Sequence, residues 1–67
     1  MAKRVGLKLF RIKKNLYQQE IADKCGISVS MYCCIENGER KGSFKFWNRL
    51  QSEFGLTDKE VEKLKKG

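Results

Sequence analysis

Two short apolar-patterned segments, separated by a single glycine, limit the folds that this 67-residue chain can adopt. Ile21, Ala22 and Cys25 fall on one face of a helix, which we expect to run over residues 18–24. Gly26 follows, and glycine adopts the left-handed backbone of a tight turn without the steric cost that a Cβ atom brings. The chain can therefore change direction directly after this helix, and the small Ala22 lets a second helix cross close to it.

The segment after the glycine has the pattern of a second helix over residues 29–36. Ser28 is a good N-cap, because its hydroxyl can accept a hydrogen bond from a free N–H group of the first turn. Tyr32 and Ile35 form the inward stripe, and the pair Asn37-Gly38 is a typical C-cap signal. Two short helices joined by a four-residue turn that contains glycine make a helix-turn-helix.

Three further helices complete an all-α prediction of one domain over residues 1–67. Residues 1–4 are expected to be a frayed basic start, followed by a helix that begins at Lys3 or Arg4 and ends at Lys14, before Asn15. Ser43 caps a fourth helix that ends at Gly55. Its predicted inward stripe is Phe44, Trp47, Leu50 and Phe54. The segment 57–60 has the pattern of a capping box and starts a fifth helix, which we expect to end near Lys65.

Charge and composition favour a polyanionic partner. Fifteen Lys and Arg residues against eight Asp and Glu residues give a net charge of +7, which favours nucleic acid first and an anionic membrane second. The sequence contains neither a long apolar run nor the apolar core of a signal peptide, so we expect a cytoplasmic protein without a membrane role. There is no histidine, and three cysteines at positions 25, 33 and 34 lack the spacing of a metal site. We therefore expect no metal, no cofactor, no small-molecule substrate and no enzymatic activity.

The spacing of the central residues also resembles a known family. The matching blocks are Leu16-Tyr17-Gln18, Ala22, Gly26-Ile27-Ser28 and Ile35-Glu36-Asn37-Gly38. Together they resemble the lambda-repressor-like (Cro-type, XRE) helix-turn-helix DNA-binding domains, and the resemblance covers residues 7–56. It implies a five-helix fold in which residues 29–36 form the recognition helix. It also implies a buried ion pair between Arg11 and Glu36.

The resemblance implies a DNA-binding surface as well. Gln18 would contact the DNA backbone or a base edge, and Arg40 and Lys41 would contact phosphates from a glycine-bounded loop that we expect to be flexible. Between them, short side chains would face the major groove. The complete set of predicted DNA-binding residues is Gln18, Ser28, Val29, Ser30, Cys33, Cys34, Asn37, Arg40 and Lys41. Because the outward face of the recognition helix carries no Arg, Lys, Asn or Gln before Asn37, direct base readout is expected to be modest.

One apolar stripe departs from the family pattern. Val5, Leu9 and Ile12 lie nearly opposite the core face that Leu7 occupies on the first helix. The C-terminal segment could fold back over this stripe, the stripe could form a dimer or partner interface, or it could simply be exposed. Phe46, which lies off the predicted inward stripe of its helix, is a second candidate for such an interface.

These observations predict a small transcriptional regulator that binds a specific double-stranded DNA sequence as a homodimer. Repression by occupancy of an operator is the expected mechanism. The alternative is a protein-interaction module, such as the antitoxin partner of a toxin–antitoxin pair, in which Val5, Leu9 and Ile12 bind the partner.

Overall fold

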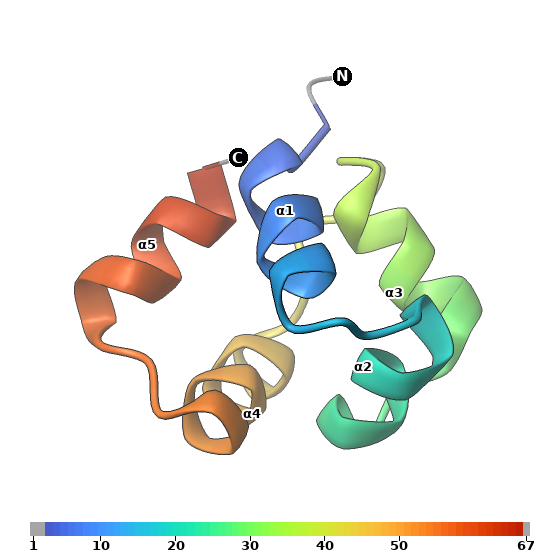
Figure 1. The fold of residues 1–67 in the computed structure, drawn as a ribbon. Coiled ribbons are helices and arrows are strands. Elements are labelled where there is room, and N and C mark those ends of the chain that lie inside the picture. Colours follow the sequence, from blue (N-terminus) through green and yellow to red (C-terminus); the bar gives the residue numbers. More distant parts are fainter. Residues whose placement is uncertain (1–2, 67) are drawn as a thin grey trace.

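The computed structural model describes residues 3–66 and contains five helices, with no strand among these residues (Figure 1). The helices are α1 (Val5–Lys13), α2 (Gln18–Cys25), α3 (Val29–Glu36), α4 (Phe44–Phe54) and α5 (Asp58–Lys66). The expected all-α class and the presence of five helices are confirmed. The first helix is shorter at both ends than predicted, and α5 ends one residue later.

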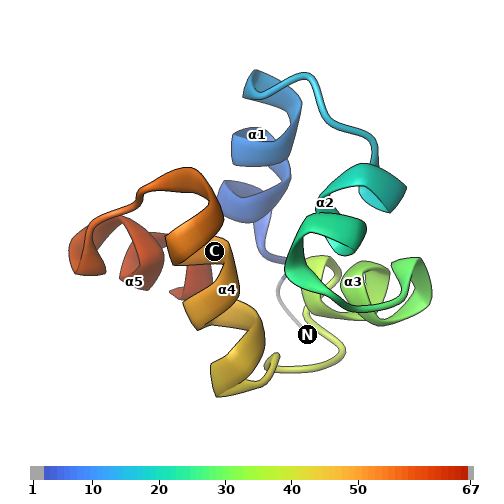
Figure 2. The same ribbon diagram turned by 90° about the horizontal axis from the view of Figure 1, so that it is seen from below.

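The helices surround one core, with α1 in the middle (Figures 1 and 2). On one side, α2 and α3 pack against each other, while α5 lies on the opposite side of α1. The buried apolar side chains come from all five helices and are Leu7, Ile21, Ala22, Cys25, Tyr32, Ile35, Phe46, Trp47, Leu50, Val61 and Leu64. None of the five helices combines the length and apolar content needed to cross a lipid bilayer.

Local capping signals define most helix ends as the sequence predicted. The Ser28 and Ser43 hydroxyls each accept a hydrogen bond from the backbone N–H three residues later, at 3.1 Å. Asn15, directly after α1, has a positive φ of 57°. At the start of α5, Thr57 and Glu60 exchange the two hydrogen bonds of a capping box, at 3.0 and 3.2 Å.

The inward face of α4 contains Phe46 in place of the predicted Phe44. Phe44 was expected in the core but is 82% exposed, whereas Phe46 was expected to form a contact surface and is 1% exposed. The buried face of α4 is formed by Phe46, Trp47 and Leu50. At about 100° per residue, Phe44 lies about 100° from the centre of that face. The spacing of three between Phe44 and Trp47 is therefore misleading, and Phe46 packs against the ring of Tyr32 instead.

Arg4, which was predicted to be frayed, instead forms hydrogen bonds to α3, to the loop after α3 and to α5. Its guanidinium donates hydrogen bonds to the carbonyl oxygens of Ile35 at 2.6 Å, Arg40 at 2.8 Å and Lys65 at 3.0 Å. It also lies 5.7 Å from the ring centre of Trp47. One side chain therefore joins the end of α3, the loop that follows it, α4 and the end of α5. Residues 1–2, the remainder of the predicted frayed start, lie outside the described residues.

We expect Arg4→Ala to lower the free energy of unfolding by about 2 kcal/mol, because several carbonyl oxygens lose a charged donor at once. In a domain of this size, that change lowers the melting temperature by about 10 °C. Lys3→Ala is the matched control, since it removes the same charge from an exposed neighbouring residue. Thermal denaturation followed by circular dichroism measures both variants. Equal melting temperatures would show that the Arg4 contacts do not stabilise the fold.

Candidate nucleic-acid interface

The turn between α2 and α3 has the geometry that its sequence predicts. Gly26 adopts φ +72°, and Ile27 donates a backbone hydrogen bond to the Ala22 carbonyl at 3.0 Å, closing the end of α2. Ile27 is partly buried against the core at this corner. Because both ends of the turn are fixed, α3 leaves the corner in one direction and keeps one face toward the core.

The outward face of α3 is a line of three short polar side chains. Tyr32, Ile35 and Glu36 are buried on the opposite side of the helix. Ser30, Cys34 and Asn37, at spacings of four and three, therefore lie along the outward face. Ser30 and Asn37 are exposed and Cys34 is half-buried. The structure thus places three of the predicted DNA-binding residues on one line over the whole length of α3.

Two other predicted reading residues lie at the edge of this face. Val29 is partly buried and packs against the core rather than pointing fully outward. Cys33 is also half-buried, and its Sγ donates a hydrogen bond to Gln18 Oε1 at 3.2 Å. Ser28 uses its hydroxyl to cap α3. Fewer of the predicted DNA-binding side chains at α3 are therefore available to contact a ligand than the sequence suggested.

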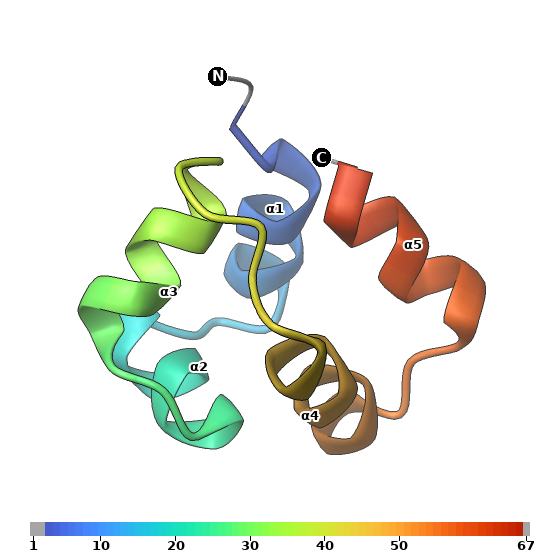
Figure 3. The ribbon, with the colours of Figure 1, turned by 180° about the vertical axis from the view of Figure 1, so that it is seen from behind.

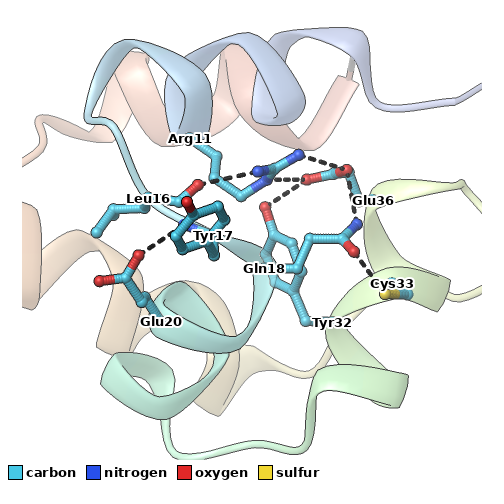
Figure 4. A network of polar contacts seen from close by, with 8 residues as sticks. All are labelled: Arg11, Leu16, Tyr17, Gln18, Glu20, Tyr32, Cys33 and Glu36. Carbon is cyan, nitrogen blue, oxygen red and sulfur yellow. Dashed lines mark hydrogen bonds and ion pairs between the residues drawn. The ribbon is translucent and has the colours of Figure 1, made fainter.

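Behind this face, a polar network surrounds the carboxylate of Glu36 (Figure 4). Arg11 Nε lies 3.0 Å from Glu36 Oε2, and the Tyr32 hydroxyl donates to the same oxygen at 2.7 Å. Gln18 Nε2 donates to Oε1 at 3.2 Å. Arg11 also donates from Nη1 to the Leu16 carbonyl at 2.9 Å. The implied ion pair is therefore present, and it links α1, α2 and α3 through one buried carboxylate.

The network also shifts the ionisation of its members. Burial acts to raise the pKa of the Glu36 carboxyl, but the hydrogen bonds from Arg11 and Tyr32 outweigh it and lower that pKa. The hydrogen bond to Glu36 raises the pKa of Arg11. Burial, followed by the neighbouring carboxylate, raises the pKa of Tyr32. Glu36 therefore stays charged and Tyr32 stays protonated at neutral pH.

Gln18 is held in place at the start of α2. Its amide oxygen accepts from Cys33 and its amide nitrogen donates to Glu36, which leaves one N–H of the NH₂ group for an external acceptor. The start of α2 is also better capped than predicted, because Glu20 Oε1 accepts from the Tyr17 N–H at 2.8 Å. The glutamate three residues after the cap position is a capping-box signal, although tyrosine replaces the usual Ser or Thr.

The loop from Gly38 to Gly42, called here the basic loop, forms hydrogen bonds with α3 and α4. The N–H groups of Glu39 and Arg40 both point to the Cys34 carbonyl, at 2.9 and 3.2 Å. Trp47 Nε1 donates to the Lys41 carbonyl at 3.0 Å. A Cβ atom on Gly42, which has φ +80°, would lie 2.8 Å from that same nitrogen. Only glycine fits there without a shift, because the approach of the indole leaves no room.

The basic loop presents its cations to solvent. Arg40 and Lys41 are both exposed, and within residues 3–66 their side chains form no hydrogen bond or ion pair. Seen from behind, this loop leaves the end of α3 and crosses to the start of α4 (Figure 3). Two exposed cations therefore follow the C-terminal end of α3, where they line a hollow together with Met31 and Ile35 of that helix.

The cysteines do not form a metal site within the described residues. All three are free thiols, and no group of three potential ligands comes together in this part of the chain. Burial raises the pKa of the Cys25 thiol to about 11, so this residue behaves as a small apolar side chain in the core.

A comparison with protein families matches residues 7–61 to the family described as helix-turn-helix. The match covers most of the chain and includes all of α2, α3 and α4. No curated protein and no solved structure matches the chain.

Proposed function

The chain belongs to the XRE/lambda-repressor-like family of helix-turn-helix DNA-binding domains, and we propose that it is a repressor that binds a specific operator as a homodimer. The family consists of DNA-binding regulators, which agrees with the net charge of +7. Recognition helices of two copies would enter successive major grooves, and occupancy of a promoter would block transcription.

The observation that carries this proposal is the position of the basic loop at the C-terminal end of α3, directly after the outward-facing residues of that helix. Ser30, Cys34 and Asn37 offer small polar groups along one helix face, and Arg40 and Lys41 offer two exposed cations at its end. A recognition helix needs both features, because phosphate contacts set the register and base contacts carry the sequence information. The hydrogen-bond network around Glu36 holds α3 in position relative to α1 and α2.

The side chains on α3 determine how DNA would be read. Serine can donate to or accept from a base edge, but its short side chain requires a close approach of the helix backbone. Gln18, at the start of α2, keeps one N–H for a phosphate, and the free N–H groups of a helix N-terminus favour an anion there. With few base contacts available per copy, two copies on adjacent half-sites would supply the affinity that one cannot.

We expect Arg40→Ala combined with Lys41→Ala to weaken binding about tenfold or more for every DNA sequence alike. The loss of two phosphate contacts should also reduce the slope of log K against log salt by about two. Lys59→Ala with Lys63→Ala is the matched control, since it removes the same charge from exposed residues of α5 on the other side of the molecule. Gel-shift titrations of random and promoter DNA at several salt concentrations measure the effect.

The phosphate assignment would be contradicted if the double variant changed sequence preference while the salt slope stayed the same. That result would indicate that Arg40 and Lys41 contact base edges rather than phosphates. Equal losses in the double variant and in its α5 control would instead indicate a general effect of net charge.

A second candidate function is a protein-interaction module, such as an antitoxin partner. The observation in its favour is the apolar stripe on α1, which remains half-exposed at Val5, Leu9 and Ile12. The salt-dependent gel shift distinguishes the two functions, because a pure interaction module would bind neither random nor promoter DNA.

A further inference from the structure

The outer face of α1 carries an apolar stripe that no other described helix covers. Val5, Leu9 and Ile12, called here the outer α1 stripe, are 52%, 51% and 49% exposed. The alternative that the C-terminal segment folds over it is wrong, because α5 packs on the other side of α1, where Phe10 and Leu64 line one hollow and where Phe54 of α4 meets Phe10 edge-on. The ring centres of this pair lie 5.2 Å apart.

Lysines flank the outer α1 stripe on both sides. At about 100° per residue, Lys8 lies about 70° to one side of its centre and Lys13 about 70° to the other. Both are exposed, and α1 contains no acidic residue. This face therefore combines an apolar centre with two positive margins, and its electrostatic complement is an apolar helix face with acidic margins.

The outer α1 stripe is continuous with the candidate DNA interface. A hollow of about 460 Å³ is lined by Val5 and Leu9 on α1 and by Gln18 and Asn37 from the recognition side. Lys8 also lines this hollow. A ligand seated on the outer α1 stripe would therefore reach the groups that are proposed to contact DNA.

We propose that the outer α1 stripe binds an acidic amphipathic helix of another protein, and that this partner displaces DNA. The inference rests on the proposed DNA-binding function, because it assigns a regulator to that same surface. Leucine-type anchors on the partner would cover Val5, Leu9 and Ile12, and its carboxylates would pair with Lys8 and Lys13. The partner's negative charge would also compete with phosphates for the cations around the hollow.

A second copy of this chain fits the stripe less well. An antiparallel pair of α1 helices would bring the lysine margins of both copies together without any acidic residue of α1 to compensate. An anionic membrane is also less suited, because surface-bound amphipathic helices present a larger continuous apolar face.

Peptide binding by the full chain tests the proposal. The probe is a fluorescent synthetic helix with leucines at i, i+4 and i+7 and glutamates on both margins. Its control peptide carries lysines in place of the glutamates. We expect the acidic peptide to bind, to lose affinity with added salt, and to displace a labelled DNA duplex from the protein. We expect the lysine peptide neither to bind nor to displace the DNA duplex.

A matched pair of variants locates the site. Leu9→Gln with Ile12→Gln should weaken peptide binding about tenfold or more, because two apolar contacts are lost. Phe44→Gln should change it less than about twofold, since it alters an even more exposed apolar residue on α4. Amide chemical shifts of the unmodified protein on addition of peptide locate the site independently, in case a variant fails to fold.

Several outcomes would overturn the proposal: no binding of the acidic peptide at millimolar concentration, equal binding of the lysine peptide, or shifts centred away from α1. Tighter binding to anionic phosphatidylglycerol vesicles, or self-association that the double variant abolishes, would assign the stripe to a membrane or a second copy. Peptide binding without displacement of DNA would refute the regulatory part. Failure of the protein alone to bind DNA would refute the proposed function. The peptide-binding measurement would still test whether the outer α1 stripe binds an acidic helix.

Discussion

Replacing Glu36 with glutamine is expected to destabilise the domain by about 3 kcal/mol, whereas Glu39→Gln should change stability by less than about 0.5 kcal/mol. Glu36 is only 5% exposed and receives hydrogen bonds from Arg11, Tyr32 and Gln18. A neutral amide leaves the charged Arg11 side chain, itself only 13% exposed, without its counter-charge. Glu39 is one residue past the turn after α3 and is exposed, so it is the matched control.

The loss would be large relative to the total stability of so small a domain, for which one core rarely supplies more than about 5 kcal/mol. Urea denaturation of the wild type and both variants at pH 7 measures the difference. We expect the midpoint of Glu36→Gln to fall well below the other two. Equal midpoints for the two variants would mean that the buried pair adds nothing to stability.

The same carboxylate should also make stability depend on pH. Since the pKa of Glu36 is lower in the folded state than its ordinary value, its contribution is complete above about pH 5 and is lost as the pH falls through the folded pKa. The stability difference between wild type and Glu36→Gln should therefore shrink in acid. Glu60, whose pKa is also lowered, is present in both proteins and cancels from the difference. A difference that stays constant down to pH 3 would contradict this assignment.

The features that the sequence predicted correctly depend on short-range interactions. Ser28 and Ser43 cap helices through bonds to the residue three positions later, and Gly26 adopts its turn whatever surrounds it. These signals need only neighbouring residues, so they can be read directly. The spacing from Gln18 to Gly38 therefore predicted the helix-turn-helix that α2 and α3 form.

The features that the sequence missed depend on contacts between distant segments. Arg4 bonds to carbonyl groups 31, 36 and 61 residues away, and no local pattern marks a basic residue near the start of a chain as an anchor. Phe44 and Phe46 are both compatible with an amphipathic helix. Phe46 is the buried one, and its ring packs against the ring of Tyr32 on α3. Half-burial of Cys33 likewise follows from the position of Gln18 on another helix.

The second large effect concerns DNA specificity, which Ser30→Leu should abolish. Ser30 is exposed on the outward line of α3, so a leucine there does not disturb the core. In the proposed complex the short side chains require a close approach to the base edges, and a bulky apolar side chain prevents it. The expected loss at the preferred site is about 1–3 kcal/mol, the usual scale of one good base contact. Binding to random DNA should stay nearly unchanged, because Arg40, Lys41 and Gln18 remain.

Ser52→Leu is the matched control, since it makes the same substitution at an exposed serine of α4. Circular dichroism melts of both variants should resemble that of the wild type. A shift in the melt of Ser30→Leu alone would show that Ser30 supports the fold as well.

The decisive measurement is the ratio of dissociation constants for random DNA and for a duplex selected from a random pool by the wild-type protein. We expect the ratio to be well above one for the wild type and for Ser52→Leu, and to fall close to one for Ser30→Leu. A wild-type ratio preserved in Ser30→Leu, together with loss of DNA binding on Leu9→Gln with Ile12→Gln, would contradict the assignment of α3 as the recognition helix.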